Sequence, residues 1–117
     1  MAATATRPRR EHRLSPKLIR EIVRRILTVS SPEKIILFGS AATGQMTSDS
    51  DIDLLVVERK PGDVWDRAVR IRHELRGILY PFDVIVMSAE WFEATKDAIG
   101  GIAHPATSQG KVIYEAE

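Results

Sequence analysis

Three aspartates lie at the starts of two apolar runs and could together hold a metal ion. Asp51 and Asp53 open the run 51–57, and Asp83 lies near the start of the run 82–87. Side chains of a strand alternate between its two faces, so Asp51 and Asp53 project from one face about 6–7 Å apart. Such a pair repels itself and is costly to desolvate without compensation. A hard divalent cation supplies that compensation, and Mg²⁺ favours one or two carboxylates together with substrate phosphates.

Asp83 joins this pair if the strands formed by the two runs are neighbours in a sheet. Three carboxylates can hold two ions about 3.5–4 Å apart. That arrangement activates an attacking oxygen and stabilises a leaving oxygen in phosphoryl or nucleotidyl transfer. The sequence therefore predicts Asp51, Asp53 and Asp83 as metal-binding and catalytic residues.

A glycine–serine corner lies upstream of the aspartates. Gly39 and Ser40 directly follow the β-branched and aromatic run 34–38, and ten residues separate them from Asp51. Glycine lets a backbone approach a ligand closely, and free N–H groups at the start of a helix bind phosphate. The Ser40 hydroxyl adds a donor. A phosphate-binding corner beside metal-binding carboxylates fits a nucleoside triphosphate, so we expect ATP or another triphosphate to bind Gly39 and Ser40.

Each of these features also has a simpler structural explanation when taken alone. Paired aspartates often begin strands, a Gly-Ser step is often a turn, and Asp83 could cap a turn after Pro81. An EF-hand calcium loop is excluded, because its sixth position would be Leu54 rather than Gly and its twelfth Lys60 rather than Glu. Only the joint arrangement favours a metal-dependent triphosphate site.

Periodicity and turn signals indicate the elements that must position these residues. Ser15 followed by Pro16 predicts the start of a helix. Asp63 is expected to cap a second helix, and Ser88 a third that ends near Gly100. One face of the second helix is marked by Val64, Ala68, Ile71, Leu75 and Ile78. Strands are predicted at 34–38, 51–57 and 82–87, with a short edge strand at 111–114.

The order of elements defines the expected fold class. The segment 39–50 is a loop with one helical turn after Ser40, so helices and strands interleave along the chain. This favours an α/β (α+β) fold in which helices pack against a small mixed β-sheet, with an α-β-α-β-α-β core. The 117 residues fit one domain, 14–117, preceded by a flexible basic tail, 1–13.

Composition limits the remaining classes. The chain has no cysteine, which excludes disulfides and thiol chemistry. Its apolar runs are too short for a membrane span, and no secretory signal is present, so we expect a cytoplasmic protein. A net charge of +1 and a short basic tail make a nucleic-acid partner unlikely. Four arginines of the second predicted helix form either a solvated face or a docking patch for an acidic partner: Arg67, Arg70, Arg72 and Arg76.

The segments 38–44 and 50–56 resemble the signature of the minimal nucleotidyltransferases of the DNA polymerase beta-like superfamily. That signature is Gly-Ser, ten residues and Asp-x-Asp, and the likeness extends over residues 15–115. The resemblance implies a mixed sheet covered by helices. It implies that Asp51 and Asp53 bind both metals and that Asp83 helps one metal and the acceptor hydroxyl. It also implies that Gly39 and Ser40 bind the triphosphate.

The resemblance further implies a partner. Such minimal domains are often paired with a helical HEPN-class protein, and in those pairs the nucleotidyltransferase resembles an antitoxin that transfers AMP to a hydroxyl of the toxin. Two alternatives stay open: a small-molecule acceptor of the aminoglycoside type, and a catalytically decayed partner-binding module. Many relatives carry a basic residue where this chain has Thr43, which keeps the second alternative open. The acceptor, the nucleotide preference and any homo-oligomer stay undetermined at this stage.

Overall fold

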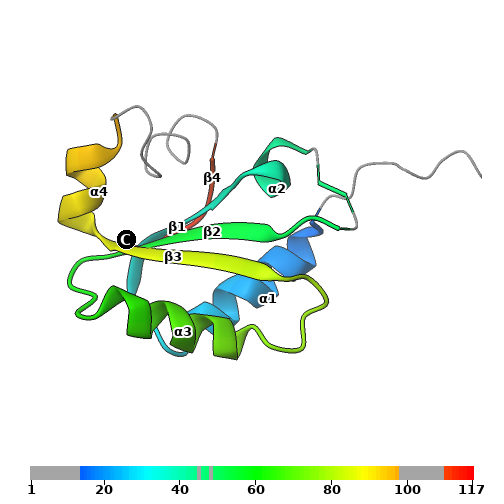
Figure 1. The fold of residues 1–117 in the computed structure, drawn as a ribbon, viewed down its shortest axis with the longest axis horizontal. Coiled ribbons are helices and arrows are strands. Elements are labelled where there is room, and N and C mark those ends of the chain that lie inside the picture. The colour runs from blue at the N-terminus through cyan, green and yellow to red at the C-terminus, as the bar shows by residue number, and fades with distance from the viewer. Residues whose placement is uncertain (1–13, 45, 48, 98–109) are drawn as a thin grey trace, which may run out of the picture.

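A computed structural model describes residues 14–44, 46, 47, 49–97 and 110–117 (Figure 1). Helices and strands interleave along the chain, as the periodicity predicted. The elements are α1 (Pro16–Ile26), β1 (Pro32–Phe38), α2 (Ser40–Thr43), β2 (Ile52–Glu58), α3 (Val64–Glu74), β3 (Phe82–Ser88), α4 (Ala89–Thr95) and β4 (Lys111–Glu115).

The four strands form one mixed sheet in the order β3-β2-β1-β4. Strand β1 runs antiparallel to both β2 and β4, whereas β2 and β3 run parallel. The predicted α/β class with a small mixed sheet is confirmed, and β4 is an edge strand as expected. The parallel pairing of β2 with β3 makes neighbours of the two strands that carry the predicted catalytic aspartates.

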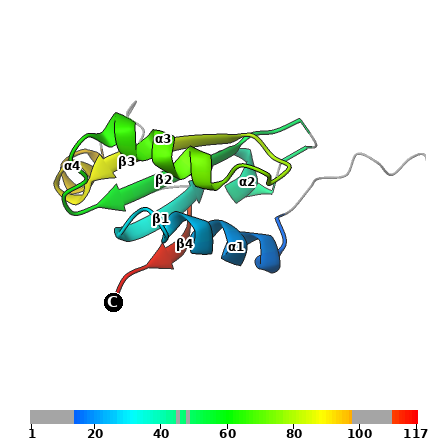
Figure 2. The same ribbon diagram turned by 90° about the horizontal axis from the view of Figure 1, so that it is seen from below.

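The two faces of the sheet are buried by different helices. Alternate residues of β2, such as Leu54 and Val56, join the main core with Ile22 of α1 and Ile71 of α3. The intervening residues of β2 face the other way, where Leu55 packs in a smaller cluster with Phe92 of α4 and other residues. Figure 2 shows α1 and α3 side by side on one face of the sheet. The opposite face is therefore the one on which odd-numbered residues of β2 and β3 project.

Local capping explains where the helices begin. The side chain of Ser15 accepts a hydrogen bond from the Leu18 N–H, and Pro16 occupies the first position of α1. Asp63 caps α3, and Ser88 caps α4 in the same manner. All three predicted caps are confirmed.

The predicted helix ends were too late. Helix α3 ends at Glu74, so Ile78 lies outside it. The reason is local, because Gly77 has a φ of 95°, a left-handed conformation that cannot continue an α-helix. Helix α4 ends at Thr95 rather than near residue 100. The predicted end of this helix and the tail 1–13 lie outside the described residues. None of the helices in the described part of the chain has the length and hydrophobicity that a bilayer crossing requires.

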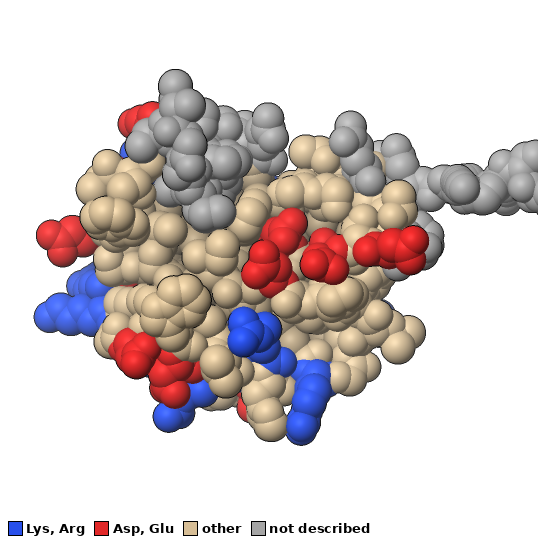
Figure 3. Space-filling view, viewed as in Figure 1, with Lys and Arg blue, Asp and Glu red and all other residues tan. Residues whose placement is uncertain are grey.

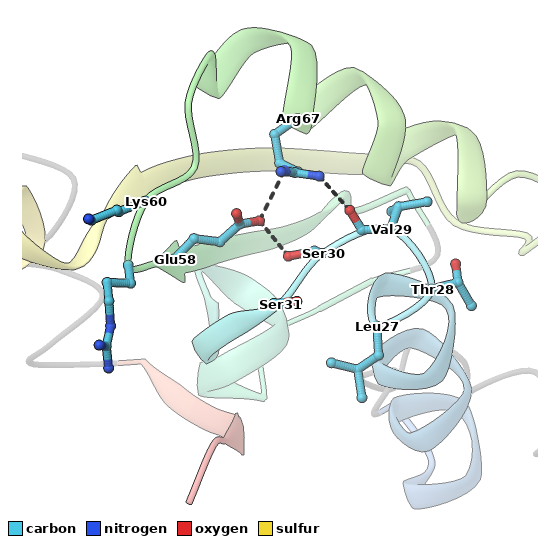
Figure 4. Close-up of a pocket in the computed structure, with 9 residues that line it drawn as sticks. Leu27, Thr28, Val29, Ser30, Ser31, Glu58, Lys60 and Arg67 are labelled. Atoms are coloured by element: carbon cyan, nitrogen blue, oxygen red, sulfur yellow. Dashed lines mark hydrogen bonds and ion pairs between the residues drawn. The ribbon is translucent and has the colours of Figure 1, made fainter.

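A buried charged brace joins the far end of β2 to α3 and to the loop before β1. Glu58 is 3% exposed, and its Oε2 accepts a hydrogen bond of 2.5 Å from the Ser30 hydroxyl. The Arg67 Nε lies 3.3 Å from the same oxygen, and Arg67 also donates to the Val29 carbonyl at 2.6 Å (Figure 4). These groups line a cleft of about 480 Å³. A buried carboxylate needs a compensating charge, and Arg67 supplies it to Glu58. The contacts of these two residues therefore hold β2, α3 and the loop before β1 together.

Arg67→Ala is expected to destabilise the fold by roughly 3 kcal/mol, because it leaves Glu58 buried without its cation. Chemical denaturation at neutral pH measures this loss. Arg70→Ala is the matched control, since Arg70 forms an exposed ion pair with Asp66 on the same helix. Such pairs contribute about 0.5 kcal/mol or less. Equal losses in the two variants would show that the brace does not stabilise the fold.

Candidate active site

Asp53 and Asp83 lie side by side on neighbouring strands. In the parallel ladder of β2 and β3, Asp53 is the direct partner of Asp83. Neighbouring strands are about 4.8 Å apart, and residues paired across a ladder point to the same face. That face also carries Leu55 and Met87 of the smaller cluster. The predicted convergence of these two aspartates therefore follows from the strand pairing.

Asp51 lies one residue before β2 and is exposed to solvent. A turn directly precedes Asp51 in the chain. In this turn the Ser50 N–H donates to the Thr47 carbonyl at 3.1 Å, and the Thr47 N–H donates to the Ser50 hydroxyl at 2.9 Å. We did not anticipate this turn, although its Thr and Ser are residue types that favour turns. Figure 3 shows acidic side chains gathered where β2 and β3 begin, close to α2.

The three aspartates interact electrostatically. Burial raises the pKa of Asp53 above its ordinary value, and the nearby charges of Asp83 and Asp51 raise it further. Asp83, like Asp51, is exposed, so Asp53 is the inner member of the group. Without a bound cation, the charged form of Asp53 is thus less favourable in the folded protein than in a freely solvated aspartate. A cation bound between these carboxylates would reverse that effect.

The carboxylates of this site fit a cation that takes some of its ligands from the protein and the others from a bound substrate. Among the described residues, no three acidic or histidine side chains are arranged as a ready-made metal cluster. A closed cage is not what Mg²⁺ requires, because it keeps several waters and is held by one or two carboxylates plus substrate phosphates. The Asp53–Asp83 pair, with Asp51 at the strand entrance, meets that requirement in residue type and position.

Gly39 lies directly against the carboxylate of Asp53. Phe38, the last residue of β1, pairs with Asp53 in the antiparallel ladder, and α2 begins at Ser40. Gly39 has a φ of 69°, and a Cβ built on it would overlap the Asp53 Oδ2 and lie 3.2 Å from its Cγ. Only glycine fits there without displacing the carboxylate. The two halves of the sequence pattern, Gly-Ser and Asp-x-Asp, therefore meet in space.

Thr43 lies at the end of α2, where many relatives are expected to carry a basic residue. Its side chain is exposed, and its hydroxyl donates at 3.4 Å to the Gly39 carbonyl. The hydroxyl thus bonds to its own helical turn. It supplies no positive charge to the corner formed by Gly39 and Ser40.

Asp53→Asn is expected to stabilise the protein at pH 7 in the absence of divalent cations. The folded state holds the Asp53 proton to a higher pH than the unfolded chain does. The stabilising contribution of this group is therefore complete below the unfolded pKa and is lost as pH rises through the folded pKa. Because water screens this partly exposed site, we expect Tm to rise by about 2–4 °C at pH 7.

Thermal unfolding with a chelator, at pH 7 and again below the ordinary aspartate pKa, measures this effect. The difference in Tm between the variant and the parent should vanish at the acidic pH. Asp66→Asn is the control, because the exposed Asp66 pairs with Arg70 and should not stabilise when neutralised. A lower Tm of Asp53→Asn at pH 7 would contradict the repulsion described here.

Comparisons with known proteins identify the family and the fold of this chain. The family described as nucleotidyltransferase domain matches residues 17–103. A search of curated proteins found no match.

Several solved structures share the fold, among them the three described next. A chain of a toxin–antitoxin structure with AMP-PNP has a TM-score of 0.61 and 19% identity, over 85% of this chain and 74% of its own. A Sulfolobus solfataricus protein provisionally assigned as a nucleotidyltransferase has a TM-score of 0.57 and 25% identity, over 85% and 78%. A chain of the complex between the tri-AMPylated Shewanella oneidensis HEPN toxin and MNT antitoxin has a TM-score of 0.51 and 20% identity, over 86% and 72%.

Proposed function

This chain belongs to the nucleotidyltransferase domain family, and on that basis we propose that it transfers AMP from ATP to a hydroxyl group of a partner protein. The partner is a helical protein of the HEPN class, and the chain is the antitoxin of the pair. The observation that carries this proposal is the Asp53–Asp83 pair against the backbone of Gly39. The similarity to chains solved with AMP-PNP and with an AMPylated HEPN toxin supports the choice of nucleotide and partner.

Each residue of the site has a role in this proposal. Asp51, Asp53 and Asp83 hold Mg²⁺, which when bound neutralises triphosphate charge and increases the acidity of the attacking hydroxyl. The corner of Gly39 and Ser40 binds the phosphates, because the missing side chain of Gly39 allows close approach and Ser40 opens a helical turn.

The chemistry balances without a further reactant. The acceptor oxygen forms a bond to the α-phosphorus of ATP, and the bond from that phosphorus to the bridging oxygen of pyrophosphate breaks. Pyrophosphate leaves with the bonding electron pair. The carboxylate of Asp83 accepts a hydrogen bond from the acceptor hydroxyl and orients it for in-line attack. As the new bond forms, the hydroxyl proton passes to this carboxylate, which then releases it to solvent. Asp83 is exposed at the start of β3, so a hydroxyl on the surface of a folded protein can reach it.

Radiolabel transfer tests the proposal. The chain is incubated with Mg²⁺ and a co-expressed HEPN-class protein, using ATP labelled at either the α- or the γ-phosphate. We expect label from the α-phosphate, and none from the γ-phosphate, to become covalently attached to the partner. Attachment of the γ-label would indicate a kinase. Attachment of the α-label that persists in the Asp51→Asn/Asp53→Asn double variant would place the chemistry elsewhere.

A further inference from the structure

Strand β3 forms an open edge of the sheet. Within the described residues it pairs only with β2 and lies at the end of the strand order. Its central residues Val84, Ile85 and Val86 include no charge and no proline, which are common protections of an edge. The opposite edge differs, because β4 has five residues, begins with Lys111 and pairs with β1 through a register shift. Strand β3 is thus the edge suited to pairing with another strand.

Helix α3 turns an exposed apolar and basic flank toward this edge. Its core-facing residues include Ala68 and Ile71. About a quarter of a turn to one side, Arg67 bonds to the loop after α1. On the other side, Trp65 lies about a quarter of a turn and Val69 about a third of a turn from the core-facing residues, and these side chains are 81% and 54% exposed. Because α1 lies on the first side, this second flank faces the β3 edge, where α3 lies in Figure 2.

Further apolar groups surround the same strand. At its carboxyl end a cleft of about 440 Å³ is lined by Val64, Met87 and Trp91, among others. Trp91 is exposed, and so is Leu79 in the segment that leads into β3. The described residues include six exposed large apolar side chains. Four of them flank β3 and two do not: Trp65, Val69, Leu79 and Trp91, against Leu27 and Val112. Such clustering marks an interaction surface.

We propose that a second copy of this chain occupies this edge, with the β3 strands of the two copies paired antiparallel across a two-fold axis. Two identical antiparallel strands are self-complementary, so the four strands of each copy form one continuous sheet. Pairing centred on Ile85 keeps all seven residues of β3 in register. Asp83 then lies opposite Met87 of the other copy, so the two Asp83 carboxylates do not meet.

The α3 flanks are complementary under the same symmetry. They run antiparallel beside each other, which brings Trp65 of one copy toward Arg76 of the other, and both side chains are exposed. An arginine over a tryptophan face is a favourable cation–π contact. Two aromatic side chains, two aliphatic ones and the strand edge bury on the order of 700 Å² per copy, close to the size of a stable interface.

This dimer brings part of each copy to the catalytic acids of the other. Helix α4 follows β3 and lies on the face that carries Asp83. Since the carboxyl end of one β3 meets the start of the other, Trp91 of one copy lies beside the acid group of its neighbour. The dimer does not depend on AMP transfer, and its test is independent of that proposal.

Site-specific oxidation tests the register directly. The natural chain has no cysteine, so a single introduced cysteine can react only with its copy. In the proposed dimer, two Cα atoms at position 85 face each other within the range that a disulfide spans. I85C should therefore form a covalent dimer at least about ten times faster than V112C, which lies on the opposite edge. Equal rates would overturn the proposal.

Light scattering after gel filtration gives a second test. At about 100 μM the natural chain should have twice the monomer mass of 13.1 kDa. Val69→Lys should be monomeric, whereas Val112→Lys, with the same substitution at a similarly exposed valine, should stay dimeric. Circular dichroism shows whether both variants stay folded. A monomeric natural chain, or a dimer insensitive to Val69→Lys, would contradict pairing through β3.

Discussion

Asp53→Asn is expected to lower AMP transfer by roughly 10³-fold or more. Asp53 is the innermost carboxylate of the site, paired with Asp83 across the ladder and in contact with Gly39. Asparagine keeps the shape of the side chain but removes the charge that binds a cation. The loss should therefore appear in kcat/KM, measured with α-labelled ATP and the partner protein, while the fold is retained.

A neighbouring acid provides the control for this prediction. Asp49 is exposed on the loop before β2, belongs to the same acidic region of sequence and lies outside the Asp-x-Asp pattern. Asp49→Asn should keep transfer within about twofold of the natural chain, since water screens the charge of an exposed side chain that does not hold the cation. Similar losses in the two variants would mean that general negative charge, rather than Asp53, supports the reaction.

Gly39→Ala is expected to lower transfer by roughly 10²-fold through displacement of Asp53. A Cβ at position 39 would overlap the Asp53 carboxylate, so that side chain must move away from its place beside Asp83. A displacement of about 1 Å is enough for a loss of this size. The substitution also strains the backbone, because φ at this position is 69°.

Gly62→Ala separates the strain from the displacement. Gly62 has a φ of 70°, close to that of Gly39, but a Cβ there would meet nothing within 4 Å. Gly62→Ala should lose about 1 kcal/mol of stability in chemical denaturation. Gly39→Ala should lose more, because a φ of 69° with a ψ of −152° is a backbone region that only glycine readily adopts. Only Gly39→Ala should also lose transfer activity. If Gly62→Ala is equally inactive, backbone strain alone accounts for the effect and the contact with Asp53 is not required.

The features that sequence could predict are those set by local chemistry. Ser15, Asp63 and Ser88 cap helices through bonds to residues two or three positions away, so short sequence patterns reveal them. Alternation along β2 likewise placed Asp53 on the face opposite the main core. Both kinds of inference depend on neighbours in the chain.

The features that sequence could not predict depend on distant segments. The parallel pairing of β2 with β3 left the position of Asp83 conditional until the strand order was known. The contact of Gly39 with Asp53, and the deeper burial of Asp53 than of Asp51, arise where three strands meet. No pattern within one strand contains that information, because it is a property of the packed sheet.

Paramagnetic broadening by Mn²⁺ and ATP tests most directly whether the aspartates and the glycine–serine corner form one cation–triphosphate site. In spectra of the isotope-labelled chain, amide signals of Gly39, Ser40, Asp53 and Asp83 should broaden first. Those of Asp63 and Asp66, at the other end of the sheet, should persist. Asp53→Asn should abolish the selective effect. Broadening that centres on Asp63 and Asp66, or that is unchanged in the variant, would contradict the proposed site.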